Sequence, residues 1–144
     1  MVRKFRIILV CGSLCLAACS HTDPIGKTYP VKGKVYLDGE LLQAGSVGFF
    51  PAEQSEGAPA FEAAGRIKED GSYELSTRGK PGALLGKYKV TVISQTKAEP
   101  NRPESFTSLV PKEYTNKETT PLIVEVVKKP DEAKYDLQMN SKGR

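Results

Sequence analysis

The residue types that most often carry out catalysis or bind metals are scarce in this sequence and lie near its start. Histidine occurs once, at His21, and cysteine occurs at Cys11, Cys15 and Cys19. A serine or cysteine nucleophile needs a histidine that a third group holds in place, and a structural zinc site needs several Cys or His ligands. The polar segment around His21 offers neither arrangement. We therefore expect a non-catalytic protein without a metal or another cofactor.

Acidic residues could supply other chemistry, but they stand in turn sequences. Paired carboxylates serve glycosidases and bind calcium, and the candidates here are Asp38, Glu69-Asp70 and Asp131-Glu132. Glycine follows both Asp38 and Asp70, which is a turn signal, so we assign these acids to turns. The glycine-rich residues 79–86 lack the Gly-Lys-Ser/Thr ending of a phosphate-binding loop and predict a hairpin connection instead.

The beginning of the chain has the organisation of a secretory signal peptide. Arg3, Lys4 and Arg6 precede an apolar run that ends at Ala18. The run has about a dozen residues, which is fewer than the roughly 20 needed to span a bilayer. We therefore expect residues 1–18 to be a cleaved signal peptide rather than a membrane-spanning helix.

The sequence Leu16-Ala17-Ala18-Cys19 resembles the bacterial lipobox. The resemblance implies that a signal peptidase recognises Leu16, Ala17 and Ala18 and cuts before Cys19. It also implies that Cys19 carries a covalent lipid with acyl chains such as palmitate. Two acyl chains give stable anchoring, so the expected location is a bacterial cell envelope, on a periplasmic or surface-facing membrane.

Two details bear on that location. Ser20 after the cysteine resembles the class of lipoproteins sorted to the outer membrane, which is the membrane that we expect. The alternative is a soluble secreted protein cut near Ala18, in which Cys19 would be a free thiol at the new N-terminus. A polar tether at residues 19–28 follows the cut.

The charge of the chain does not favour nucleic acid as a partner. The sequence has 21 Lys and Arg against 17 Asp and Glu, and three of the basic residues precede Cys19 while no acidic residue does. The remaining chain is nearly neutral, and the pair Lys128-Lys129 is too short to form a basic patch. We expect the membrane and another envelope component to be the partners.

Apolar and polar residues alternate along most of residues 29–139, the expected domain. The pattern predicts about seven short strands with one polar face each and no sustained helix. Sheets of this kind must pack apolar faces together, so we expect an all-β fold, a single antiparallel β-sandwich, and a loose tail at residues 140–144. The expected core residues are Val35, Phe49, Ile67, Leu75, Tyr88, Val90, Val124 and Leu137. Phe50 should lie outside the core.

One long connection, residues 96–120, has no clear strand. It contains Pro100, Pro103 and Pro111 and several apolar residues. Structureless loops longer than about 15 residues are usually functional or disordered. We predict a compact packed loop with a turn of helix near residues 104–108, and we name Phe106, Leu109 and Tyr114 as a candidate interaction surface.

Five segments resemble a carboxypeptidase-regulatory-like, or transthyretin-like, domain. They are GKVYLDG at residues 33–39, GSVGF at 45–49, DGSYEL at 70–75, GKYKVTV at 86–92 and VPKEY at 110–114. The resemblance implies a seven-stranded prealbumin-like sandwich, similar to immunoglobulin domains. It implies no catalytic residue, because the family offers none to carry over.

These observations lead to two functional hypotheses. The first is a non-catalytic, lipid-anchored envelope protein that scaffolds or binds another envelope protein. The alternative is a module that binds a polysaccharide or a small ligand, for which Tyr36, Phe50 and Tyr114 are the candidate outward-facing rings. An exposed aromatic pair in a groove would favour the second, and an apolar patch with a polar rim would favour the first.

Overall fold

The computed structural model describes residues 24–52, 59, 61–96, 101 and 105–142. Within these residues the fold is all-β, as predicted, with ten strands and one short 3-10 helix but no α-helix. The predicted signal peptide, its recognition residues Leu16, Ala17 and Ala18, the lipid acceptor Cys19 and His21 lie outside the described residues.

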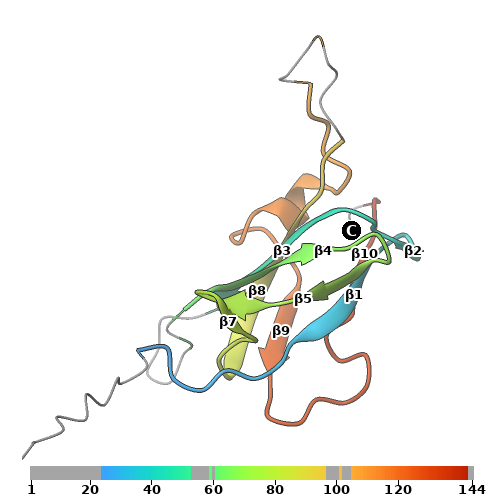
Figure 1. Cartoon of the computed structure of the whole chain (residues 1–144). Coiled ribbons are helices and arrows are strands. Elements are labelled where there is room, and N and C mark those ends of the chain that lie inside the picture. Colours follow the sequence, from blue (N-terminus) through green and yellow to red (C-terminus); the bar gives the residue numbers. More distant parts are fainter. Residues whose placement is uncertain (1–23, 53–58, 60, 97–100, 102–104, 143–144) are drawn as a thin grey trace, which may run out of the picture.

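The strands form one curled sheet (Figure 1). The sheet path runs β10-β1-β5-β4-β3-β8-β9, while β2 extends β1 and the β6–β7 hairpin extends β4. The elements are β1 (Lys32–Leu37), β2 (Glu40–Leu41), β3 (Gly45–Pro51), β4 (Ala63–Ile67), β5 (Ser72–Glu74), β6 (Ser76–Thr77), β7 (Lys80–Pro81), β8 (Gly86–Ile93), the 3-10 helix η1 (Lys112–Thr115), β9 (Ile123–Val126) and β10 (Leu137–Met139).

Neighbouring strands are antiparallel with one exception, which corrects the expectation of a purely antiparallel architecture. β10 pairs with β1 in parallel, with Val35 opposite Leu137. The two ends of the sheet path are β9 and β10, and they are consecutive in the chain. The chain must therefore cross from one end of the sheet to the other after β9, and it reaches β1 running in the same direction as that strand.

The apolar face of each strand points into a common core. Seven of the eight predicted core residues are buried; Val124 is half-buried and packs against the core. Val124 stays half-buried because β9 ends the sheet path and no further strand pairs with its outer edge. The ring of Phe49 lies 5.7 Å from the ring of Tyr88 and 6.4 Å from that of Tyr73, within the range of favourable aromatic contacts.

The predicted turns form where the sequence indicates them. Asp38 and Gly39, with φ of 53° and 87°, connect β1 to β2. Arg78 and Gly79, with φ of 48° and 84°, connect β6 to β7 within the glycine-rich segment. Two successive positive φ angles characterise the tight hairpin turn whose twist matches that of the flanking strands.

Both ends of the described chain are held by the domain. Thr28 Oγ1 donates a hydrogen bond to the carbonyl of Pro81, and Lys80 Nζ donates one to the carbonyl of Gly26. Tyr29 also forms an antiparallel β-bridge with Ala83. At the other end, Ser141 N donates to Asp38 Oδ1 at 2.8 Å. The ordered domain therefore includes the last part of the expected tether and the first part of the expected tail.

Candidate functional site

The long connection forms a two-stranded arm, defined here as residues 94–96 and 105–109. Leu109 N donates to the carbonyl of Ser94 at 2.8 Å, and Thr96 N donates to the carbonyl of Thr107 at 2.9 Å. Between these two bonds, Gln95 and Ser108 form an antiparallel β-bridge. Figure 1 shows the arm projecting beyond the end of the sheet, so this part of the connection extends away from the core. The later residues Val110, Tyr114 and Thr120 of the same connection are buried.

The predicted turn of helix near residues 104–108 is wrong for the residues that are described. Residues 105–107 are not helical, Ser108 forms a β-bridge with Gln95, and the helical turn is η1, farther along the chain. Pro111 precedes η1 with φ of −56°, an angle that suits the start of a helix. In the arm, hydrogen bonds between residues 94–96 and 105–109 satisfy backbone groups that a helix would have used.

The structure separates the three residues proposed as an interaction surface. Phe106 and Leu109 lie on the arm with 56% and 46% of their surface exposed. Tyr114 is a core residue, and its hydroxyl accepts a hydrogen bond from the backbone N–H of Asn140. Tyr114 is therefore removed from the surface. Ile93, which is 44% exposed at the base of the arm, was not among the residues predicted to form an interaction surface. Its position lies on the polar face of β8, so the alternation of that strand could have indicated that it is exposed.

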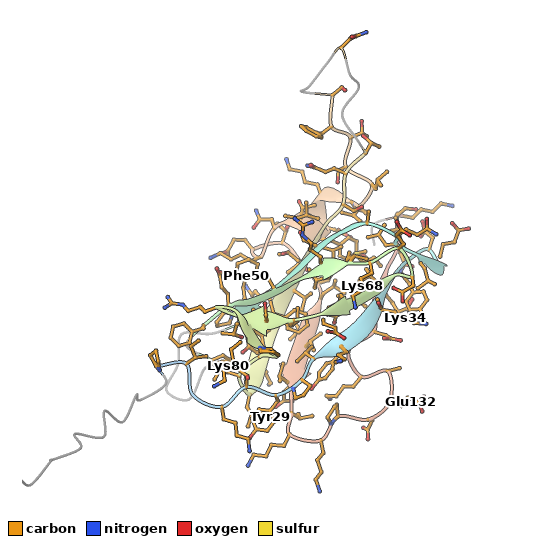
Figure 2. All side chains as sticks on the ribbon, viewed as in Figure 1. Tyr29, Lys34, Phe50, Lys68, Lys80 and Glu132 are labelled. Atoms are coloured by element: carbon orange, nitrogen blue, oxygen red, sulfur yellow. The ribbon has the colours of Figure 1, made fainter. Side chains whose placement is uncertain are left out.

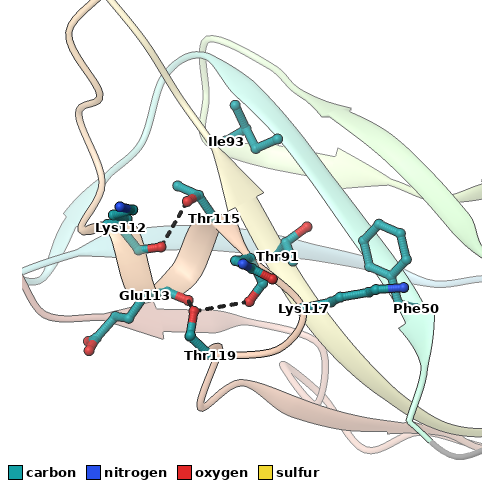
Figure 3. Close-up of a pocket in the computed structure, with 9 residues that line it drawn as sticks. Phe50, Thr91, Ile93, Lys112, Glu113, Thr115, Lys117 and Thr119 are labelled. Carbon is teal, nitrogen blue, oxygen red and sulfur yellow. Dashed lines mark hydrogen bonds between the residues drawn. The ribbon is translucent and has the colours of Figure 1, made fainter.

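A groove lies beside the base of the arm, between the outer face of β3 and β8 and residues 112–119 (Figure 3). Its volume is about 710 Å³. The lining side chains are mostly polar but include one aromatic and one aliphatic residue: Phe50, Thr91, Ile93, Lys112, Glu113, Thr115, Asn116, Lys117 and Thr119. Sequence reasoning named only Phe50 from this set.

Local hydrogen bonds give the wall of the groove its shape. Thr115 Oγ1 donates to the carbonyl of Lys112 at 2.8 Å, and Thr119 Oγ1 donates to the carbonyl of Glu113 at 2.9 Å (Figure 3). Thr120 ties this wall to the sheet, because its buried hydroxyl donates to the carbonyl of Val90 at 2.6 Å. These bonds fix the backbone of residues 112–120, from which the exposed side chains of Lys112 and Lys117 line the groove.

The aromatic rings proposed for sugar binding do not share a face. Tyr36 is half-buried on β1, which β5 and β4 separate from β3, and Tyr114 is in the core. Of the three rings, Phe50 is the one that lines the groove, and Lys117 Nζ lies 5.8 Å from its ring centroid.

The acidic candidates occupy turns. Asp70 Oδ1 accepts hydrogen bonds from the Ser72 hydroxyl at 2.6 Å and from Ser72 N at 3.0 Å, and these bonds lower the pKa of Asp70. Asp38 binds Ser141 in the same manner, which lowers its pKa. Across the described residues, no three His, Cys, Asp or Glu side chains gather in a way that could hold a metal ion.

Two buried tyrosines act as hydrogen-bond donors. Tyr73 donates to the carbonyl of Tyr135 at 2.6 Å, and Tyr88 donates to the carbonyl of Leu84 at 2.9 Å. Burial raises the pKa of both phenols, that of Tyr88 to about 12. Both hydroxyls therefore stay protonated at neutral pH, and their role is to link strands to loops.

No family model, no curated protein and no solved structure matches the chain. In the described part of the chain, no helix has the length and apolar character required to cross a membrane.

Proposed function

We propose that this chain is a lipid-anchored protein of a bacterial cell envelope that binds another envelope protein through its arm. The observation that carries the proposal is the arm itself, a hydrogen-bonded ribbon that exposes Phe106 and Leu109, with Ile93 exposed at its base. Large apolar side chains exposed on a projecting element favour a protein partner, because apolar burial drives protein association.

The position of the arm supports this role. Figure 2 places Tyr29 and Lys80 at the end of the domain where the described chain begins, and the arm projects from the opposite end. Residues 26–29 are held against β7 by the bonds described above. If Cys19 carries a lipid, few residues separate the membrane from the domain, and the arm points away from the membrane toward a partner.

We further propose that the curled sheet is a transthyretin-like β-sandwich of the carboxypeptidase-regulatory-like type. Strands at both ends of the sheet path contribute to one core, since Leu137 and Met139 of β10 and Val126 of β9 are all buried in it. Apolar faces that meet across a shared core are the defining feature of sandwich packing. No catalytic role is proposed.

The anchor is tested by the substitution Cys19→Ala. We expect the wild-type protein to incorporate a fatty-acid probe and to partition into the detergent phase. The Cys19→Ala variant should do neither and should keep its signal peptide, because the lipid acceptor is gone. Ser20→Ala is the matched control and should still be labelled. Wild-type protein that is unlabelled and freely soluble would exclude the lipid anchor.

The arm is tested by the double substitution Phe106→Ser and Leu109→Ser. Both side chains are exposed, so the free energy of unfolding should change by no more than about 0.5 kcal/mol for each substitution. Cross-linking of the full-length protein in its native membrane should yield a partner with wild type and lose it with the double variant. Ile123→Ser is the matched control, because Ile123 is 64% exposed on β9, away from the arm. An undiminished cross-link in the double variant, or equal loss with Ile123→Ser, would contradict the proposal.

A further inference from the structure

The groove has a polar group at its base that the protein itself leaves unused. Thr91 lines the groove, and only 5% of its surface is exposed. Its hydroxyl has no hydrogen-bond partner among the described residues, in contrast to the buried hydroxyls of Thr77 and Thr120, which donate to the carbonyls of Gly82 and Val90. Among the described residues, the buried side-chain polar atom without a partner is Ser94 Oγ. The Thr91 hydroxyl therefore keeps contact with the solvent of the groove and is accessible for a hydrogen bond with a ligand.

An apolar surface lies next to this hydroxyl. The Phe50 ring covers Gly48, where an added Cβ would lie 2.9 Å from the ring and 3.0 Å from Thr91 Oγ1. The absence of a side chain at position 48 therefore lets the ring and the hydroxyl approach each other. Figure 3 shows Phe50 and Thr91 on the sheet and Lys117 beside the ring.

Lysines lie beside the ring and along the groove. Lys117 Nζ lies 5.8 Å from the ring centroid, Lys89 is directly opposite Phe50 on β8, and Lys112 lines the far wall. Glu113 is the acidic residue of the lining. Within the described residues none of these three lysines forms an ion pair, whereas Lys32 pairs with Glu74 on another face. The groove therefore favours a negatively charged ligand.

We propose that this groove binds an acidic oligosaccharide of the uronic acid class. Its carboxylates would pair with Lys112 and Lys117, a sugar hydroxyl would bond to Thr91, and the apolar face of a sugar ring would contact Phe50. The groove is open and holds about 710 Å³, which is larger than a single small anion requires and within the range of ligand pockets. The site is separate from the exposed side chains of the arm tip, so it is a binding activity beyond the proposed protein contact.

The proposal is tested by calorimetric titration of the full-length protein in detergent. The probes are β-1,4-tetramannuronate, α-1,4-tetragalacturonate and a hyaluronan tetrasaccharide. The neutral control, β-1,4-mannotetraose, differs from the first probe only at C6. We expect at least one acidic probe to bind at least about tenfold more tightly than mannotetraose, the ratio expected for one charge-assisted hydrogen bond. Added salt should weaken this binding.

Two substitutions separate binding from folding. Thr91→Val should leave the melting temperature unchanged or raise it, because the hydroxyl has no partner in the protein, and it should weaken binding about fivefold. Lys117→Met should weaken binding about tenfold at an unchanged melting temperature. Lys34→Met, a lysine on β1, is the matched control and should bind as wild type does. Failure of all three acidic probes at millimolar concentration, equal binding of mannotetraose, or unchanged affinity in both groove variants would overturn the proposal.

Discussion

Replacing Phe49 with Ala is expected to lower the free energy of unfolding by about 3–5 kcal/mol, whereas replacing its neighbour Phe50 should lower it by less than about 1.5 kcal/mol. Phe49 has no exposed surface and contacts the rings of Tyr73 and Tyr88. Its loss would leave a cavity at the centre of the core. Phe50 lies on the opposite face of β3, half-buried in the open groove, where solvent can fill the space.

The measurement is denaturant unfolding of the two variants beside wild type. The pair is its own control, since the same atoms are removed from adjacent positions on one strand. Successive residues of a strand face opposite sides, so the ratio of the two costs reports the register directly. Equal costs, or a larger cost for Phe50→Ala, would show that β3 faces the core with the other set of residues.

The register of β3 and most of the core could be predicted because the information is local. In β3 and in the first half of β8 the side chains alternate between buried and accessible positions, and Val47, Phe49, Tyr88 and Val90 fall on the buried side. Asp38-Gly39 forms the turn that its residue types favour. Such signals need only neighbouring residues, and each of them identifies a strand face or a turn without knowledge of which strands pair.

Pairing over long distances could not be predicted. No local pattern indicates that β10 lies parallel to β1, because that contact joins residues about a hundred positions apart, as in the pair Val35 and Leu137. Tyr114 illustrates the same limit. Its place in the chain indicates a loop, and only the packing of η1 against β8 buries its ring. The groove was missed for this reason, since it joins Phe50 and Thr91 of the sheet with Lys117.

The crossing that leads to β10 depends on a glycine in β1, and Gly33→Ala should therefore lower the free energy of unfolding by about 3 kcal/mol, the upper part of the range for overpacking. A methyl group at position 33 would overlap the carbonyl oxygen of Tyr135 and lie 3.1 Å from the Tyr73 ring. That carbonyl cannot easily move, because it accepts the Tyr73 hydroxyl at 2.6 Å. The next residue is held as well, since Asp136 Oδ1 accepts a hydrogen bond from Lys34 N at 2.8 Å.

Gly39→Ala is the control for the effect of alanine on the backbone alone. Gly39 has φ of 87° and no atom within 4 Å of an added Cβ, so its cost should be about 1 kcal/mol, from the left-handed conformation and not from a clash. The two variants, unfolded in denaturant and followed by hydrogen exchange, should also differ in where protection is lost. Gly33→Ala should expose the amides of β10 first, because the crossing chain must move away from β1 to accommodate the methyl group. Equal costs for the two variants, or full protection of β10 in Gly33→Ala, would mean that Tyr135 and Asp136 do not pack on β1 as the structure has them. The parallel pairing of β10 would have to be abandoned with that contact.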